Sequence, residues 1–324
     1  MPTLRQPRLH RCLACVLAAG AMLLLGGCRT MLFGALNSTD QHKDIQVERS
    51  LPYAPAQHLS LDVYLPAHVQ HAPVVVFFYG GDWTHGKREW YRFVGTALAA
   101  KGVIVVIPDY RKYPHVGLDG FMQDAAHAVA WAHQHAASLG GDPQSLFVMG
   151  HSSGAQIAGL LATDPSWLAA DGLSLHDLAG FVGLAGVYDF VPLPKKEADM
   201  RHLFGTQASE QRRADPMTFV RGNDPPMLLL QGTADREVRA AGSVALARKA
   251  HAVHDDAEAR LYPGIGHMDL LLALSRPMRH HAPTLSDVLA FIRAHERNTP
   301  PRVASQSTMH VNTVNPMEAG DVGG

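Results

Sequence analysis

A serine flanked by glycines is the side chain of this sequence best suited to nucleophilic chemistry. It is Ser152, in the motif GHSSG at 150–154, which follows an apolar run at 146–150 and opens a helix-like stretch at 153–162. A serine on a tight strand-to-helix turn presents its hydroxyl, the glycines leave room for neighbouring backbone, and the helix N-terminus favours developing negative charge. The pattern predicts acyl transfer through Ser152, and a serine that merely caps a helix is the alternative.

A second glycine-containing turn could stabilise the negative oxygen that forms when a carbonyl is attacked. The sequence YGGDW at 79–83 follows the apolar run VVVFFY, and its two glycines would let backbone amides approach a substrate. We expect an oxyanion hole made by the amides of Gly81, Asp82 and Ser153, and a simple strand-ending turn is the alternative. The indole of Trp83 would either line the acyl side of the site or pack beneath this loop.

An aspartate and a histidine follow later strands and complete a candidate triad. Asp235 ends the motif GTAD after the run MLLL, and His267 ends GIGH after a strand-like stretch at 259–262. In the order Ser, Asp, His, the histidine takes and returns the serine proton, while the aspartate orients the imidazole and stabilises its protonated form. A turn aspartate and a surface histidine are the alternatives, with Glu237 and Asp189 as competing acids.

The elements that must position these residues alternate between apolar runs and helix-like stretches. Continuous apolar runs are typical of parallel strands covered on both faces, so the alternation predicts a mostly parallel central sheet with helices on both faces. The catalytic loops would then lie at the carboxyl ends of the strands. The predicted strands are 59–65, 74–79, 103–107, 146–150, 181–185, 227–230 and 259–262. The predicted helices are 89–100, 120–137, 153–162, 240–252 and 284–295.

One connection is longer than a helix crossover needs. Residues 190–224 carry large apolar side chains among charged ones, namely Met200, Leu203, Phe204, Met217 and Phe219. The segment is interpreted either as a small cap insertion that supplies an apolar pocket over the site or as an ordinary helix of the outer layer, and the pattern favours neither.

Several motifs stand in one order along the chain: LDVYLP from residue 61, YGGDW, PDYR at 108–111, GGDP at 140–143 and GHSSG. Together they resemble the α/β-hydrolase esterases, and more narrowly the carboxylesterase and feruloyl-esterase-like branch that includes isoprenylcysteine methylesterases and kynurenine formamidases. The resemblance spans residues 59–296 and implies the α/β-hydrolase fold and a serine esterase that needs no cofactor. It also implies a structural ion pair or loop clamp at Asp109 and Arg111. Tyr79 stands where the family usually has a histidine that braces the loop.

The resemblance does not specify the substrate. The predicted partner is a small-molecule carboxylic ester, cleaved through an acyl-enzyme intermediate at Ser152. An amidase or formamidase acting on a small amide uses the same acyl transfer and is one alternative. A non-catalytic hydrolase-fold lipoprotein is another, because a fold does not guarantee activity. No oligomeric state is implied.

The first residues resemble a bacterial export signal. Three arginines within residues 1–11 precede an apolar run at 12–25, which is too short to span a membrane as a helix. The following LGGC resembles the lipobox, which implies that Cys28 is lipidated and becomes the mature N-terminus. We therefore expect a lipoprotein signal peptide at 1–27 and a protein anchored in the cell envelope outside the cytoplasm, in the periplasm or at the outer membrane. An ordinary signal peptide or an uncleaved anchor is the alternative.

The rest of the chain is predicted to be one domain between two loose segments. Residues 28–43 are interpreted as a tether, residues 44–297 as the α/β-hydrolase domain, and residues 298–324 as a disordered tail without hydrophobic periodicity. All three cysteines lie within the first 28 residues, so the mature domain is expected to contain no disulfide.

Composition and charge exclude two classes of protein. Hydrophobic residues make up 47% of the 324-residue chain, enough for a large core, which excludes global disorder. The formal net charge is −1, which argues against nucleic acid as the main partner because phosphates require a positive surface. The 20 histidines would suit metal binding, but HExxH is absent and His127, His133 and His135 lack i, i+4 spacing, so no metal is expected.

Overall fold

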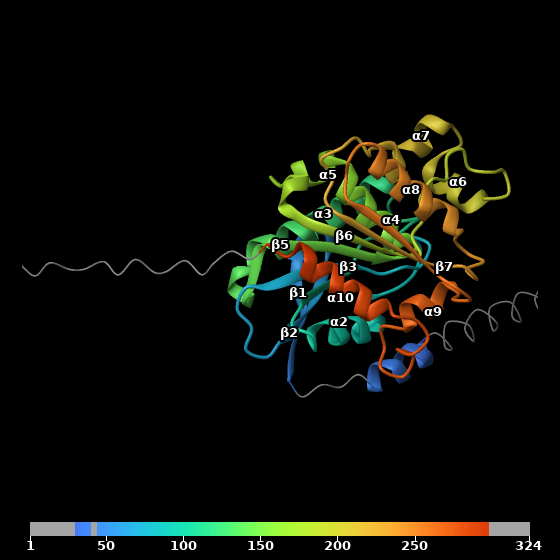
Figure 1. Cartoon of the computed structure of the whole chain (residues 1–324). Coiled ribbons are helices and arrows are strands. Elements are labelled where there is room, and N and C mark those ends of the chain that lie inside the picture. Colours follow the sequence, from blue (N-terminus) through green and yellow to red (C-terminus); the bar gives the residue numbers. More distant parts are fainter. Residues whose placement is uncertain (1–29, 40–43, 298–324) are drawn as a thin grey trace, which may run out of the picture.

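The computed structural model describes residues 30–39 and 44–297, and within them eight strands form one sheet (Figure 1). The order is β1-β2-β4-β3-β5-β6-β7-β8, in which β1 pairs antiparallel with β2, β2 pairs antiparallel with β4, and all other pairs are parallel. The strands are β1 (Ile45–Ala54), β2 (Leu59–Pro66), β3 (Ala72–Phe78), β4 (Ile104–Pro108), β5 (Gly141–His151), β6 (Leu178–Leu184), β7 (Met227–Gly232) and β8 (Ala257–Tyr262). The predicted mostly parallel sheet is confirmed.

Burial explains which strands could be predicted. Every residue of β3, β4, β6 and β7 is buried, which matches their unbroken apolar runs. β1 is not among the predicted strands. Its pairing with β2 shifts register twice, and Ser50 at the first shift has a φ of 56°, so no clean alternation of polar and apolar residues survives.

Helices cover both faces of the sheet (Figure 1). α2 and α10 contact each other on one face, whereas α3, α4 and α8 lie on the other, as the sequence predicted. The helices are α2 (Arg92–Ala99), α3 (Leu118–His135), α4 (Ser153–Thr163), α5 (Pro165–Ala169), α6 (Ala198–Phe204), α7 (Ala208–Arg212), α8 (Ala240–Ala252), α9 (His267–Leu272) and α10 (Thr284–His295).

Residues 30–39 are helical and pack on the domain. Phe33 and Leu36 are buried, and the Phe33 ring stacks on Trp90 with 5.6 Å between ring centroids. This stretch belongs to the predicted tether, which therefore includes a helix held by the domain. Of its larger apolar side chains, Phe33 and Leu36 are buried against the domain, whereas Met31 and Leu32 are exposed. In ten residues this pattern is too short to be recognised as a helix from the sequence.

The predicted signal peptide at 1–27, the predicted lipidation site Cys28 and the predicted tail at 298–324 lie outside the described residues. Among the helices that are described, none is both long enough and apolar enough to cross a membrane. The predicted domain at 44–297 lies within the described residues.

The segment between β6 and β7 forms two short helices, α6 and α7, at one end of the sheet (Figure 1). Phe204, at the end of α6, meets the ring of Trp83 edge-on with 4.9 Å between centroids, and Phe190 stacks on Phe204 at 5.7 Å. Because Trp83 belongs to the predicted oxyanion loop, the segment at 190–224 contacts that loop through Phe204. This contact favours the interpretation of the segment as a cap.

Candidate active site

Ser152 lies on the tight turn between β5 and α4. Its backbone has φ 56° and ψ −125°, a sparsely populated conformation that the surrounding structure must enforce. The amide of Ser152 donates to the carbonyl oxygen of Leu184 on β6 at 2.9 Å, so the neighbouring strand holds the turn in place. The residue is 7% exposed, which leaves a small opening to the serine.

Two glycines make this turn sterically feasible. A methyl group at Gly150 would clash with the carbonyl oxygen of Gly154, and one at Gly154 would clash with the carbonyl oxygen of Phe78 at the end of β3. The spacing of the glycines in GHSSG is therefore a packing requirement, since it lets α4 begin directly against β3 and β5.

The structure brings Asp235 and His267 together. The Oδ2 atom of Asp235 lies 2.8 Å from Nδ1 of His267, and the aspartate side chain is fully buried. Three more groups donate to this carboxylate: the amides of Glu237 and Val238, both at 2.9 Å, and the side-chain amide of Gln231 at 2.8 Å. An acceptor in this position favours the tautomer with the proton on Nδ1, which leaves Nε2 able to accept a proton.

His267 is the first residue of α9 rather than a loop residue. The turns after β7 and β8, which carry Asp235 and His267, are tied together: the amide of Ala234 donates to the carbonyl oxygen of Ile265 at 3.0 Å. A methyl group at Gly232 would clash with that same carbonyl. This hydrogen bond and the close approach at Gly232 therefore join the turn of the acid directly to the turn of the histidine.

The two competing acids occupy other positions. Glu237 is exposed, and its carboxylate lies 3.8 Å from Nε2 of His267, on the opposite edge of the ring from Asp235. Asp189 is also exposed, and its backbone amide donates to the Asp215 carboxylate at 3.1 Å. The geometry thus singles out Asp235 as the acid that can orient the imidazole.

His151 links the serine turn to the histidine. Its ring centroid lies 4.7 Å from that of His267, and its Nε2–H donates to the His267 carbonyl oxygen at 3.2 Å. Burial, and then the neighbouring His267, lower the pKa of His151 to about 3, so it stays neutral. Within the described residues no hydrogen bond joins the Ser152 hydroxyl to His267. Such catalytic hydrogen bonds are often long in free enzymes and tighten when substrate binds.

The loop after β3 passes directly against the serine. A methyl group at Gly80 would lie 3.0 Å from Cβ of Ser152. In the part of the chain that the structure describes, the backbone amides of Gly81, Asp82 and Ser153 donate to no acceptor. Unpaired amides beside a serine can stabilise an oxyanion, and these three are the amides predicted to do so.

Tyr79 braces this loop in place of the family's histidine. Its hydroxyl donates to Oδ1 of Asp109 at 2.7 Å, and its ring stacks on Tyr110 with 4.8 Å between centroids. The Tyr110 hydroxyl in turn donates to the Tyr79 carbonyl oxygen at 2.8 Å. Burial raises the pKa of both phenols, which keeps both hydroxyls protonated as donors.

The predicted clamp at Asp109 and Arg111 consists of two separate ion pairs. Asp109 pairs with Arg88, which also binds the buried carboxylate of Asp62 at 2.9 Å. Arg111 pairs with Asp124 of α3 at 2.8 Å. The two pairs join the loop after β4 to different elements, so each is a separate structural brace.

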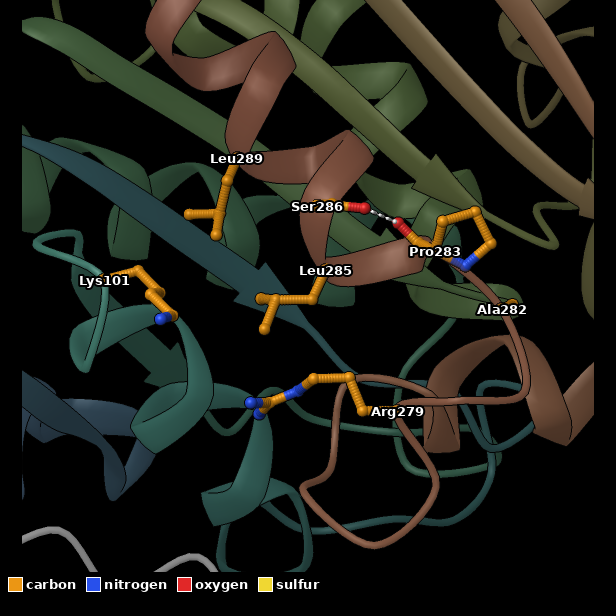
Figure 2. A pocket seen from close by; sticks show the side chains of 7 residues that line it. All are labelled: Lys101, Arg279, Ala282, Pro283, Leu285, Ser286 and Leu289. Carbon is orange, nitrogen blue, oxygen red and sulfur yellow. Dashed lines mark hydrogen bonds between the residues drawn. The ribbon is translucent and has the colours of Figure 1, made fainter.

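The hollow drawn in Figure 2 contains none of the predicted site residues. It has a volume of about 230 Å³, and it lies between the turn before β4 and the start of α10, where Lys101 and Arg279 face Leu285 and Leu289.

No metal site is found among the described residues. Within residues 30–39 and 44–297, no group of three or more His, Cys, Asp or Glu side chains could hold an ion.

The strand order, with the serine turn after β5 and the histidine after β8, defines an α/β-hydrolase. Residues 61–250 match the model of the BD-FAE family, and the chain belongs to this family. The predicted resemblance to α/β-hydrolase esterases is confirmed at this level.

Several curated relatives are named as esterases. The chain is 29% identical over 298 residues to isoprenylcysteine alpha-carbonyl methylesterase of Arabidopsis thaliana, covering 86% of this chain and 68% of the relative. It is 32% identical over 218 residues to esterase LipC of Mycobacterium tuberculosis, covering 62% and 54%. It is 30% identical over 150 residues to kynurenine formamidase of Danio rerio, covering 46% and 48%. The chain thus spans about half to two thirds of the length of these relatives.

Solved structures of esterases share the fold. Esterase B from Lactobacillus rhamnosis has a TM-score of 0.71 at 22% identity, with 90% of this chain and 97% of that chain covered. The apo form of Thermogutta terrifontis esterase 2 has a TM-score of 0.66 at 23% identity, with 80% and 98% covered. The predicted α/β-hydrolase fold is therefore confirmed.

Proposed function

We propose that this protein is a serine esterase that hydrolyses carboxylic esters through an acyl-enzyme intermediate. The observation that carries the proposal is the buried Asp235–His267 pair, held beside the strained turn that presents Ser152. The reaction class is supported by the relatives named as esterases.

Acylation begins at the Ser152 hydroxyl. Its oxygen attacks the ester carbonyl carbon while Nε2 of His267 takes the hydroxyl proton, and Asp235 stabilises the resulting imidazolium through Nδ1–H. The negative oxygen of the tetrahedral intermediate accepts hydrogen bonds from the three unpaired amides beside the serine. The imidazolium then protonates the leaving alcohol as the carbonyl carbon–alcohol oxygen bond breaks, which leaves an acyl-serine.

Deacylation repeats these roles with water as the nucleophile. His267 takes a proton from the water, whose oxygen attacks the acyl-serine, and the same amides stabilise the second tetrahedral intermediate. Return of the proton to Ser152 releases the carboxylic acid. The chain's own residues supply the nucleophile, the proton acceptor and the charge stabilisation, so the reaction needs no cofactor.

Active-site labelling tests this function. A fluorophosphonate probe should label the wild-type protein at Ser152, and Ser152→Ala should remain unlabelled while keeping the wild-type melting temperature. The wild type should hydrolyse short-chain aryl esters, and a series of acyl lengths would measure its preference. A folded wild-type protein that neither reacts with the probe nor hydrolyses any ester would instead be a non-catalytic member of the fold.

A small amide is the second candidate substrate, because one relative is named as a kynurenine formamidase. Acyl transfer to Ser152 serves both ester and amide cleavage. Side-by-side values of kcat/KM for an aryl acetate and an aryl formamide distinguish the two. A higher value for the ester supports the proposal, and a higher value for the formamide would replace the ester while retaining the triad.

We also propose that the chain is anchored in the cell envelope through a lipid on Cys28, outside the cytoplasm. The support is the sequence LGGC after an arginine-led apolar run. Mass spectrometry of the mature protein should find an acylated Cys28 at the N-terminus. An unmodified N-terminus at another residue would refute the lipid anchor without affecting the proposed chemistry.

A further inference from the structure

A buried glutamine joins three parts of the site. Gln156, on the first turn of α4, has no exposed surface. Its Oε1 accepts a hydrogen bond from Nε1 of Trp83 at 2.9 Å, and its Nε2 donates to the carbonyl oxygen of Ala214 at 2.6 Å. Trp83 ends the oxyanion loop, and Ala214 follows the cap helix α7. One side chain therefore connects the loop, the serine helix and the cap segment.

The oxyanion loop needs support because its backbone is strained. Gly81, Asp82 and Trp83 are consecutive residues with positive φ angles of 135°, 53° and 58°. Such backbone is unfavourable for residues with a side chain and persists only where packing and hydrogen bonds enforce it. The indole of Trp83 supplies both: it is 4% exposed, packs edge-on against Phe204 and donates its N–H to Gln156. Trp83 thus packs beneath the loop.

The place of Gln156 on the helix makes this support relevant to the chemistry. The amide of Gln156 donates to the Ser152 carbonyl oxygen at 3.2 Å, so the glutamine and the serine belong to one rigid turn. The Trp83–Gln156 bond therefore connects the loop that carries the amides to the turn that carries the serine, and it can fix the distance between them. Stabilisation of an oxyanion depends steeply on that distance, because the donors must match the position of the developing charge.

We propose that Gln156 is a positioning residue that holds the oxyanion amides in place through Trp83. The inference rests on the proposed esterase function. The effect should fall on the transition state rather than on ester binding, because the loop amides interact strongly only with the negative charge that develops there.

Two substitutions remove the bond from its two ends. Gln156→Met and Trp83→Phe each delete one partner. Methionine has about the length and shape of glutamine, and phenylalanine keeps an aromatic ring, though a smaller one than the indole. On a short-chain aryl ester, we expect kcat to fall about 10- to 100-fold in each variant, with KM changed by less than about twofold. The double variant should be no slower than the slower single variant, because both substitutions remove the same interaction.

An inhibitor separates this role from a structural one. An aryl trifluoromethyl ketone forms a tetrahedral adduct with the serine and carries an oxyanion, so its inhibition constant should rise by about the factor by which kcat falls. Thr163→Val is the matched control. Thr163 lies at the far end of α4, and its buried hydroxyl donates to the Gly159 carbonyl oxygen at 2.9 Å. This variant should lower the melting temperature and leave kcat and inhibition unchanged.

Three results would overturn the inference: a folded Gln156→Met that keeps wild-type kcat, an activity loss confined to KM, or losses that multiply in the double variant. Should Gln156→Met fail to fold, Trp83→Phe retains the aromatic body and carries the same test alone. A wild-type protein without esterase activity or probe labelling would contradict the proposed function instead, so the two failures are distinguishable.

Discussion

The two sides of the proposed catalytic site are supported in different ways. On the acid–histidine side, Asp235 is held mainly by amides of its own turn, and the bond from Ala234 to Ile265 ties that turn to the next. On the oxyanion side, three consecutive residues with positive φ are held by distant side chains, Tyr79 through Asp109 and Trp83 through Gln156. Changes on the first side should therefore affect chemistry, whereas changes on the second should affect stability and chemistry together.

Asp235→Asn tests the acid–histidine side and should give the largest loss of activity. An asparagine lacks the charge that stabilises the imidazolium and can present N–H to Nδ1 of His267, which favours the wrong tautomer. We expect kcat to fall roughly 10³- to 10⁴-fold, as is typical of triad aspartates. Steady-state kinetics on an aryl ester measure this loss. An equal loss in Glu237→Gln would contradict the assignment of Asp235 as the orienting acid.

His151 lies between the two sides and should make stability depend on pH. Its pKa of about 3 in the folded protein is below the ordinary 6.5, so on acidification the unfolded chain binds the proton first. The stabilising contribution is complete above pH 6.5 and is lost as the pH falls toward 3, with a loss of about 3 kcal/mol at pH 4. His151→Gln cannot titrate and should lose less unfolding free energy than the wild type between pH 7 and 4. Parallel losses in chemical denaturation would contradict this.

Tyr79→Phe tests the oxyanion side. It keeps the stacked ring and removes the hydroxyl that binds Asp109, so the free energy of unfolding should fall by about 1 to 2 kcal/mol. We also expect a several-fold loss of kcat without a matching change in KM. Tyr262→Phe is the control, since that hydroxyl binds Asp287. The control should lose stability alone, and a similar kcat loss in both variants would remove the distinction between the two sides.

Asp224 lies outside both sides of the site, and Asp224→Asn should have the smallest effect of these substitutions. Burial, and then the neighbouring Asp255, raise the pKa of Asp224 to about 7, so ionisation costs stability as the pH rises from about 4 to 7. After allowance for solvent screening, the free energy of unfolding of Asp224→Asn should exceed that of the wild type by about 1 kcal/mol at pH 8. At pH 4 the two proteins should be equally stable. Denaturation at both pH values measures this. Equal stabilisation at both would exclude a titrating carboxyl, and kcat should not change.

The acid–histidine side could be anticipated from sequence because its signals are local. Ser152, Asp235 and His267 each follow a strand within a few residues and lie in a short turn that contains glycine. The partnership of Trp83 with Gln156 joins residues 73 positions apart, and a glutamine is ordinarily exposed to water. Only tertiary packing shows that its amide is buried and bonded at both ends.

Two other differences between the predicted and the observed structure also arise from tertiary packing. The strand β1 is missed because its register shifts remove the period of two on which strand prediction depends. The start of α9 at His267 is missed because a helix of six residues is too short to show periodicity. In both places the path of the backbone depends on neighbouring elements, whereas the long apolar strands depend mainly on their own residues.

The helix at residues 30–39, which packs on the domain, shortens the free chain between the proposed lipid anchor and the domain. A free segment over residues 28–43 could extend about 55 Å, which would let the domain range well away from its membrane. With Phe33 seated on Trp90, two residue steps separate Cys28 from the helix, a span of about 7 Å. A hydrolase held so closely would encounter esters at the bilayer surface before those in bulk solution, and the side of the domain that receives Phe33 would face the lipid.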